Sequence, residues 1–149
     1  MKNLFFLCSL MLTFSAMSQN VPPSAIAFQG VVIDPNGIPV PSMDEFGNPL
    51  RSSLIKVRFS IQDSDLPSAT SHFSEEHAVT TDQYGRFSVK IGRGGQLTSA
   101  SFSDINWSLG DKFLKVEIDI SGSGNEYSLS SIQEMLSVPY ALYAAESGN

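Results

Sequence analysis

The sequence predicts an all-β protein, an antiparallel β-sandwich of about seven strands with a short C-terminal helix. Apolar and polar residues alternate with a period of two over 54–62, 86–92 and 113–120, which places alternate side chains on one face of a strand. Short turns rich in Gly, Pro, Asn and Asp separate these segments. Many short, half-apolar strands joined by such turns are typical of a sandwich.

Residues 1–18 are predicted to be a secretory signal peptide. A positive charge at Lys2 precedes an apolar run over 4–14, and small residues stand just before the predicted cleavage at Gln19. The run is short for a bilayer span. We therefore expect cleavage, no membrane insertion afterwards, and a protein that is secreted, periplasmic or on the outer cell surface. The sandwich is expected over 19–137 and a helical tail, or the start of a shaft, over 138–149.

Removal of 18 residues from 149 leaves 131, enough for one domain with a core. Without Lys2 the chain keeps 8 of its 9 basic side chains against 15 acidic ones, a net charge of −7. Such a surface is a poor partner for nucleic acid. The only cysteine, Cys8, leaves with the signal, so packing and not a disulfide must stabilise the domain.

The first predicted strand covers 25–33 and leads into DPNG (34–37). Proline at the second turn position and glycine at the fourth suit a type I turn with a following bulge, so Gly37 is expected to have positive φ. A turn-rich surface loop follows over 41–53.

The segment 54–62 is predicted to be a strand with one face in the core. Its core face is expected to carry Ile55, Val57, Phe59 and Ile61, and its water face Leu54, Lys56, Arg58 and Ser60. After a turn over 63–68, the polar segment 69–81 reads as a strand at a sheet edge. DQYG (82–85) is predicted to be a second hairpin-type turn, with positive φ at Gly85.

Two more strands are expected over 86–92 and 113–120, followed by a turn over 121–125 and one or two short strands within 127–138. The crossing loop 101–112 carries Trp107, which we expect to cover one end of the core. The predicted core consists of Val57, Phe59, Ile61, Phe87, Val89, Ile91, Leu114, Val116 and Ile118, with Ile120 also inward and Lys115, Glu117 and Asp119 outward.

The ionisable residues do not form a predicted catalytic or metal site. His72 and His77 are five residues apart in a strand, so they point to opposite faces and are interpreted as surface histidines of an edge strand. The adjacent Glu75 and Glu76 also face opposite ways. Asp63, with Asp65 in the same turn, offers oxygens to calcium, but a calcium loop needs more ligands than this segment carries.

The remaining sequence patterns indicate loops and not catalytic or ligand-binding sites. The glycines of IGRGGQL (91–97) lack the lysine and the helix of a phosphate loop and indicate unusual backbone angles. No Gly-x-Ser-x-Gly elbow is present. An isopeptide bond needs a buried lysine, and Lys56, Lys90 and Lys115 fall on the outward phase of their strands. We expect no enzyme, no catalytic residue, no metal and no cofactor.

The C-terminal stretch SVPYALYAAESGN (137–149) predicts a helix, with Ser137 as its cap and Pro139 in its first turn. Its apolar stripe is predicted to be an interaction or oligomerisation surface formed by Val138, Leu142 and Ala145, with Tyr140 and Tyr143 alongside. A helix this short is marginal alone. It either packs back on its own sandwich or meets copies of itself.

Five stretches taken together resemble the N-terminal domain of secreted fibre-like proteins from Bacteroidetes. They are FQGVVIDPNGIPV (28–40), VRFSIQD (57–63), TTDQYGRFSVKIGRG (80–94), INWSLGDKFLKVEID (105–119) and MLSVPYALYA (135–144). In that family the last motif leads into a collagen-like, coiled-coil or repetitive shaft, which here implies a trimer through an extended shaft. This sequence departs from the family in stopping at Asn149. The first and third stretches are also similar to carboxypeptidase regulatory-like and transthyretin-like modules, which are non-catalytic.

Two functions are compared. The first is a non-catalytic structural or interaction module of the cell surface, the head or anchoring domain of an oligomeric fibre, whose partners are copies of itself and a surface protein or glycan. The alternative is a carbohydrate-binding module, because sandwiches bind sugars through exposed aromatic rings. Its candidate ligand-facing residues are Trp107 and Tyr84, with Tyr127 and Phe73 as further aromatics.

Overall fold

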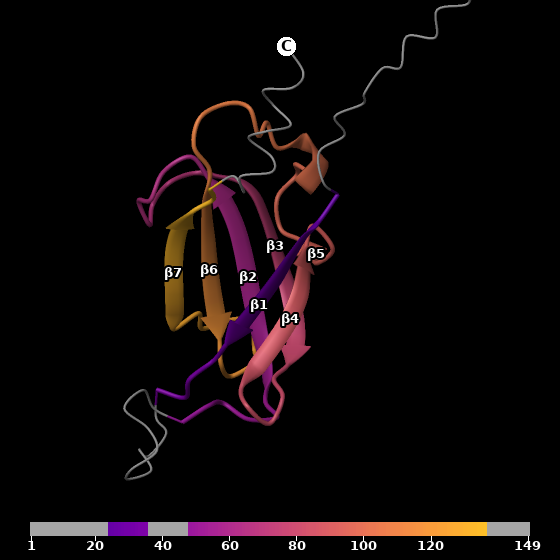
Figure 1. Cartoon of the computed structure of the whole chain (residues 1–149), viewed down its shortest axis with the longest axis vertical. Helices are drawn as coiled ribbons and strands as arrows, with labels where there is room; N and C mark the ends of the chain where they lie inside the picture. Colours follow the sequence, from indigo (N-terminus) through magenta and orange to yellow (C-terminus); the bar gives the residue numbers. More distant parts are fainter. Residues whose placement is uncertain (1–23, 36–47, 137–149) are drawn as a thin grey trace, which may run out of the picture.

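The computed structural model describes residues 24–35 and 48–136, and these residues form two antiparallel sheets packed face to face (Figure 1). The larger sheet has the strand order β5-β3-β2-β6-β7, and the smaller one pairs β1 with β4. The predicted all-β sandwich of about seven strands is confirmed. The elements are β1 (Ile26–Val31), β2 (Leu54–Gln62), β3 (Ser71–Thr80), β4 (Arg86–Ile91), β5 (Gly95–Gln96), the 3₁₀ helix η1 (Phe102–Asp104), β6 (Phe113–Asp119) and β7 (Leu129–Glu134).

The core lies between the two sheets. Its centre is β2, from which Ile55, Val57, Phe59 and Ile61 point inward with no exposed surface. The ring of Phe59 meets the edge of Phe28 from β1, with 5.0 Å between ring centres. The predicted core is confirmed as one cluster, in which Phe87, Ile91, Leu114 and Val116 are buried and Val89, Ile118 and Ile120 are partly buried.

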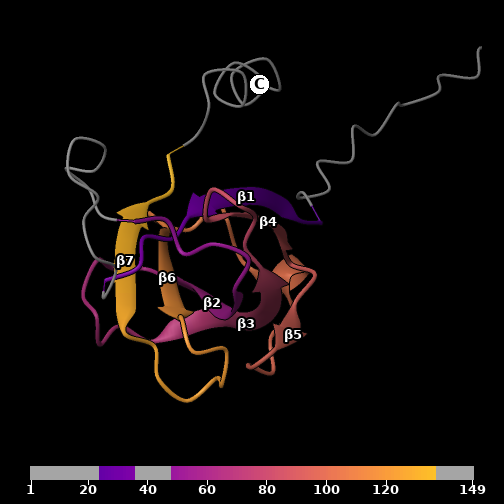
Figure 2. The ribbon, with the colours of Figure 1, turned by 90° about the horizontal axis from the view of Figure 1, so that it is seen from below.

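The two sheets differ in width, and this leaves part of the larger one uncovered. In Figure 1, β1 and β4 cross in front of β2 and β3 and the end of β1 reaches the lower end of β6, whereas nothing described lies in front of β7. Figure 2 shows the same layers end-on, with β7 at the left and β1 along the top, above β2 and β3. Both β7 and β1 therefore have one edge without a partner strand among the described residues.

The turn DQYG has the predicted local geometry. The Gly85 N–H donates to the Asp82 carbonyl at 3.0 Å, and Gly85 has φ of +73°, as predicted. The turn is not a hairpin within one sheet, however, because it carries the chain from β3 in the larger sheet to β4 in the smaller one. Gly37 of the other predicted turn lies outside the described residues.

We expect Gly85→Val to destabilise the domain by more than backbone strain alone. A Cβ atom at this position lies 2.7 Å from the Val32 carbonyl oxygen, a backbone atom that cannot move aside easily. Gly110→Val is the matched control, because Gly110 has φ of +64° but open space around it. The control should lose about 1–2 kcal/mol, and Gly85→Val more, in chemical denaturation. Equal losses would show that the contact with Val32 is irrelevant.

Several sequence predictions are corrected by the structure. The strand β3 is not at the edge, because β5 pairs beyond it at Glu75 and Glu76; β5 and η1 were not predicted. Ser60 was expected to face water but is buried, and its hydroxyl bonds that of Ser74 at 2.9 Å. Asp119 was expected outward but has no exposed surface.

The predicted helix and the residues Val138, Tyr140, Leu142, Tyr143 and Ala145 lie outside the described residues.

Candidate functional site

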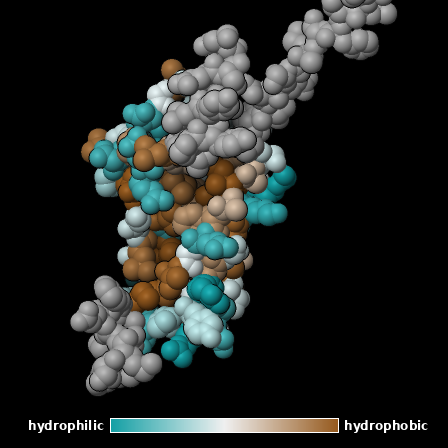
Figure 3. All heavy atoms as spheres, in the orientation of Figure 1, coloured by the Kyte–Doolittle hydropathy of each residue, from teal (hydrophilic) through white to brown (hydrophobic). Residues whose placement is uncertain are grey.

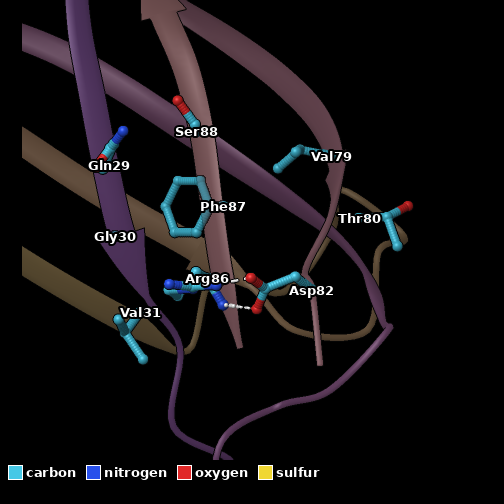
Figure 4. Close-up of a pocket in the computed structure, with 9 residues that line it drawn as sticks. All are labelled: Gln29, Gly30, Val31, Val79, Thr80, Asp82, Arg86, Phe87 and Ser88. Atoms are coloured by element: carbon cyan, nitrogen blue, oxygen red, sulfur yellow. Dashed lines mark hydrogen bonds and ion pairs between the residues drawn. The ribbon is translucent and has the colours of Figure 1, made fainter. Parts of the chain in front are cut away.

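A groove of about 580 Å³ lies at the junction of the two sheets. We call it the lateral groove. It is shown in Figure 4 and is lined by Gln29, Gly30 and Val31 of β1, Arg86, Phe87 and Ser88 of β4, Val79 and Thr80 of β3, and Asp82. The turn after β3 places Asp82 beside the start of β4, so the groove combines one charged pair with aliphatic and aromatic walls.

The charged pair of the lateral groove is held by several hydrogen bonds. Arg86 Nε donates to Asp82 Oδ2 at 2.8 Å, and the amides of Arg86 and Tyr84 donate to Asp82 Oδ1 at 3.0 and 2.7 Å. The Arg86 amide, followed by that of Tyr84 and by the Arg86 side chain, lowers the pKa of Asp82. The carboxylate is thus used to fix the turn, and it is not a proton acceptor aimed at a ligand.

The predicted ligand-facing aromatics are separated by the fold. Tyr84 is 55% exposed and its ring lies 4.8 Å from the Arg86 guanidinium carbon, beside the lateral groove. Trp107 is partly buried and packs on Phe102, with 5.5 Å between ring centres, where it covers core residues as predicted. Phe73 is 2% exposed and belongs to the core. The four aromatics therefore do not form one binding surface.

The fourth aromatic, Tyr127, belongs to a charged cluster on the outer face of the larger sheet. Its ring is covered by the Arg58 guanidinium at 3.9 Å, and its hydroxyl donates to Glu76. Lys56 donates to the same carboxylate at 2.8 Å. Burial, reinforced by the nearby carboxylate, raises the pKa of Tyr127 to about 12, so the hydroxyl stays a hydrogen-bond donor to Glu76 on the sheet surface.

A second hollow, the β1–β7 cleft, opens where the larger sheet is uncovered. It has a volume of about 180 Å³ and is lined by Phe28, Gly30 and Val31 of β1, Phe87 of β4, Val116 and Ile118 of β6, and Ser131 and Gln133 of β7. None of these lining side chains is charged. Figure 3 shows apolar surface on this side of the molecule, over β6 and β7. The cleft suits an uncharged, apolar occupant.

Glu75 is a buried acid that sequence reasoning placed on a polar edge strand. It is 1% exposed, and its oxygens accept bonds from the amides of Gly92 and Gly94, both at 2.8 Å. His77 Nε2 bonds the same carboxylate at 2.8 Å. Glu75 and Glu76 face opposite sides as predicted. The glycine-rich loop is thus wrapped around a carboxylate of its own chain and does not offer its amides to an external phosphate.

The two histidines have different surroundings. The side chain of His72 is 48% exposed and bonds Asp63. That of His77 is only 13% exposed and stands edge-on to Phe59, with 5.7 Å between ring centres. The interpretation of His77 as a surface residue is therefore wrong. It lies opposite Val57 in the register of β3 with β2, and hence on the core side.

Asp63 does not offer free oxygens to calcium, because it already pairs with two nitrogen groups. Lys112 Nζ lies 2.9 Å from Asp63 Oδ1, and His72 bonds Oδ2. The bond from Lys112, then that from His72, lowers the pKa of Asp63. Lys112 is only 6% exposed and also donates to the Leu109 carbonyl. It is a buried lysine that the strand pattern missed, because it precedes β6.

Asp119 holds the loop between β6 and β7. Its carboxylate accepts bonds from the Ser121 and Ser123 hydroxyls and from several loop amides, of which Gly124 is the closest. The spacing of Asp119, Ser121 and Ser123 is also that of ligands in some calcium loops. Here, however, the surrounding groups are donors, which repel a cation and favour the carboxylate itself.

Within residues 24–35 and 48–136, no group of three or more His, Cys, Asp or Glu side chains is placed to hold a metal ion. The same residues contain no helix that is long and apolar enough to cross a membrane. Comparisons with models of protein families, with curated proteins and with solved structures find no match. The fold and its surfaces define the described part as an antiparallel β-sandwich with buried acids that fix its loops.

Proposed function

We propose that this chain is a non-catalytic structural and interaction module of the cell exterior, the head or anchoring domain of an oligomeric fibre. The observation that carries this proposal is the open β1–β7 cleft next to the point where the chain leaves the sandwich. Leu136 follows β7 and is 78% exposed. An uncharged apolar surface at the exit of a domain suits attachment to a further structural element.

The use of the described ionisable side chains supports a structural module. The buried carboxylates of Glu75 and Asp119 accept bonds from loops of their own chain, and Asp63 is paired with Lys112. Catalytic acids and bases are instead placed to face a substrate. In the family that the sequence resembles, the segment corresponding to MLSVPYALYA leads into a shaft, which is the reason for proposing a fibre.

The oligomeric state tests the fibre proposal. The chain from Gln19 to Asn149 should be a monomer or associate weakly, because two or three helical turns bury too little surface to hold a trimer. The chain expressed together with its native downstream reading frame should be a stable trimer through the shaft. Light scattering on both proteins measures the mass. A monomeric extended chain, or a reading frame that ends at Asn149, would contradict the proposal.

A carbohydrate-binding module is the second candidate, and one observation favours it. The exposed ring of Tyr84 stands beside the lateral groove, which also carries Arg86, Gln29 and Ser88. An aromatic face next to hydrogen-bonding groups is a common way to bind a sugar ring. A glycan array decides this case: specific binding that Tyr84→Ala abolishes supports it, and an array without hits rejects it.

A further inference from the structure

We infer that the β1–β7 cleft is the docking site for residues 138–146 of the same chain, through the face that carries Leu142. The cleft is formed by side chains on the inner faces of the two sheets, which in a sandwich normally face the core. Val116 and Ile118 point into it from β6, and they belong to the hydrophobic core or pack against it. At its rim Val31 is 57% exposed. The smaller sheet ends at this point, where Ile118 is only partly buried.

The segment begins within reach of the cleft. Gln133 lines the cleft, and Leu136 is three residues further along the chain, which spans at most about 11 Å when extended. Residues 138–146, as the predicted helix, are about 13 Å long. The inner row of β6 from Leu114 to Ile118, of which Val116 and Ile118 line the cleft, has about the same length, since four residues of antiparallel strand span about 14 Å. The segment therefore matches this row in length once the chain reverses direction at Ser137–Pro139.

The chemistry of the segment also matches. Residues 138–145 carry no charge, and neither do the side chains that line the cleft. A volume of about 180 Å³ is comparable with the ~150 Å³ of an apolar cavity that accepts a benzene-sized group, so it takes one large side chain such as that of Leu142. On the same helical face, Val138 and Ala145 then extend the contact along the sheet.

Residues 138–146 of the same chain are favoured as the occupant of the cleft over those of a second copy, because they are tethered to the domain. A segment joined to the domain by a few residues has an effective concentration in the millimolar range, which a second copy does not reach in dilute solution. At 100° per residue, Tyr140 lies about 160° from Leu142 around the helix and Tyr143 about 100°, so both lie away from the face that Val138 and Ala145 share with Leu142. Their face stays free for a shaft or for other copies. Docking and trimer formation therefore use different faces of the segment and can be tested separately.

An engineered cross-link tests the docking. The chain from Gln19 has no cysteine, so Ser131→Cys combined with Leu142→Cys places one thiol in the cleft and one on the docking face. A disulfide requires the two Cα atoms to be within about 7 Å. Mild oxidation should cross-link most molecules of this variant internally, whereas Ser131→Cys with Tyr140→Cys, about 160° around the helix from Leu142, should remain reduced.

Each other outcome overturns the inference. Disulfide-linked dimers would show that a second copy occupies the cleft. No cross-link in either variant would mean that the segment does not dock there. Equal cross-linking of both would show that the segment docks without a preference for the face that carries Leu142.

In the chain without engineered cysteines, Leu142→Asp should speed amide exchange in β7 on the order of tenfold, the loss expected for one buried leucine. Tyr140→Asp should not; an equal effect of the two substitutions would also contradict the inference. Because these measurements use the unextended chain, their failure is distinct from failure of the fibre proposal.

Discussion

Phe59→Ala is expected to lower the free energy of unfolding by about 3–5 kcal/mol, the usual cost of removing a buried phenylalanine ring. Phe59 has no exposed surface and lies at the contact of the two sheets, where its ring meets Phe28 of β1 and His77 of β3. Its loss therefore removes packing from both layers. Domains of this kind are stable by only about 5–15 kcal/mol, so the variant should be close to unfolding under mild denaturing conditions.

Chemical denaturation with fluorescence of Trp107 measures this loss. Leu109→Ala is the matched control, because Leu109 is 68% exposed and its truncation should change the stability by about 0.5 kcal/mol or less. Phe59→Leu should fall between the two, since it keeps part of the apolar volume. A midpoint for Phe59→Ala that equals that of the wild type would show that this ring is not part of a packed core.

The strands and their inner faces could be predicted because alternation has a direct physical cause. In β2 every second side chain is apolar, and the predicted bounds and the predicted core face both agree with the structure. A single slip in register would place Phe59 in water, so the pattern specifies the face strongly. The same reasoning identified the inner residues of β4 and β6.

Buried polar residues were missed because hydropathy alone assigns them to water. Glu75 and His77 stand between Phe73 and Val79 at every second position of β3, so the period of two itself indicated that they face inward. The strand pattern does not identify the hydrogen-bond partners of these two side chains. The amides of Gly92 and Gly94 reach Glu75 only after the chain has passed through β4. Such long-range pairing depends on tertiary structure.

The candidate surfaces depend on which sheet each strand joins. The turn DQYG reads as a hairpin, yet β3 and β4 belong to different sheets, and this places Asp82 and Arg86 in the lateral groove. The β1–β7 cleft exists because the smaller sheet has only two strands among the described residues. Local patterns carry no information on strand order, so neither hollow was predictable.

Asp119→Asn is expected to have the other large effect, which should depend on pH. The bonds from Ser121, first, and from Ser123 and the loop amides hold the pKa of Asp119 far below its ordinary value of 3.8. An asparagine of the same shape loses the charge and turns an NH₂ donor toward groups that are themselves donors. The loop should lose its anchor, and the melting temperature at pH 7 should fall clearly.

The sign of the pH dependence follows from the lowered pKa. As the pH falls below about 4, Asp119 takes up a proton in the unfolded chain while it is still ionised in the folded one. Its contribution to stability is therefore complete above that pH and is lost progressively toward lower pH. Glu76, Asp63, Asp82 and Asp104 also have lowered pKa values, so both proteins become less stable in acid. The difference between them isolates Asp119.

Thermal melts of the wild type and of Asp119→Asn between about pH 7 and pH 2 measure this difference. The gap in melting temperature should be constant from pH 7 to about pH 5 and should narrow below pH 4, because only the wild type still has this carboxylate to lose. Asp111→Asn, at an exposed position, controls for the general change in charge and should follow the wild type throughout. Parallel curves for Asp119→Asn and the wild type would mean that the ionised carboxylate does not stabilise the loop between β6 and β7.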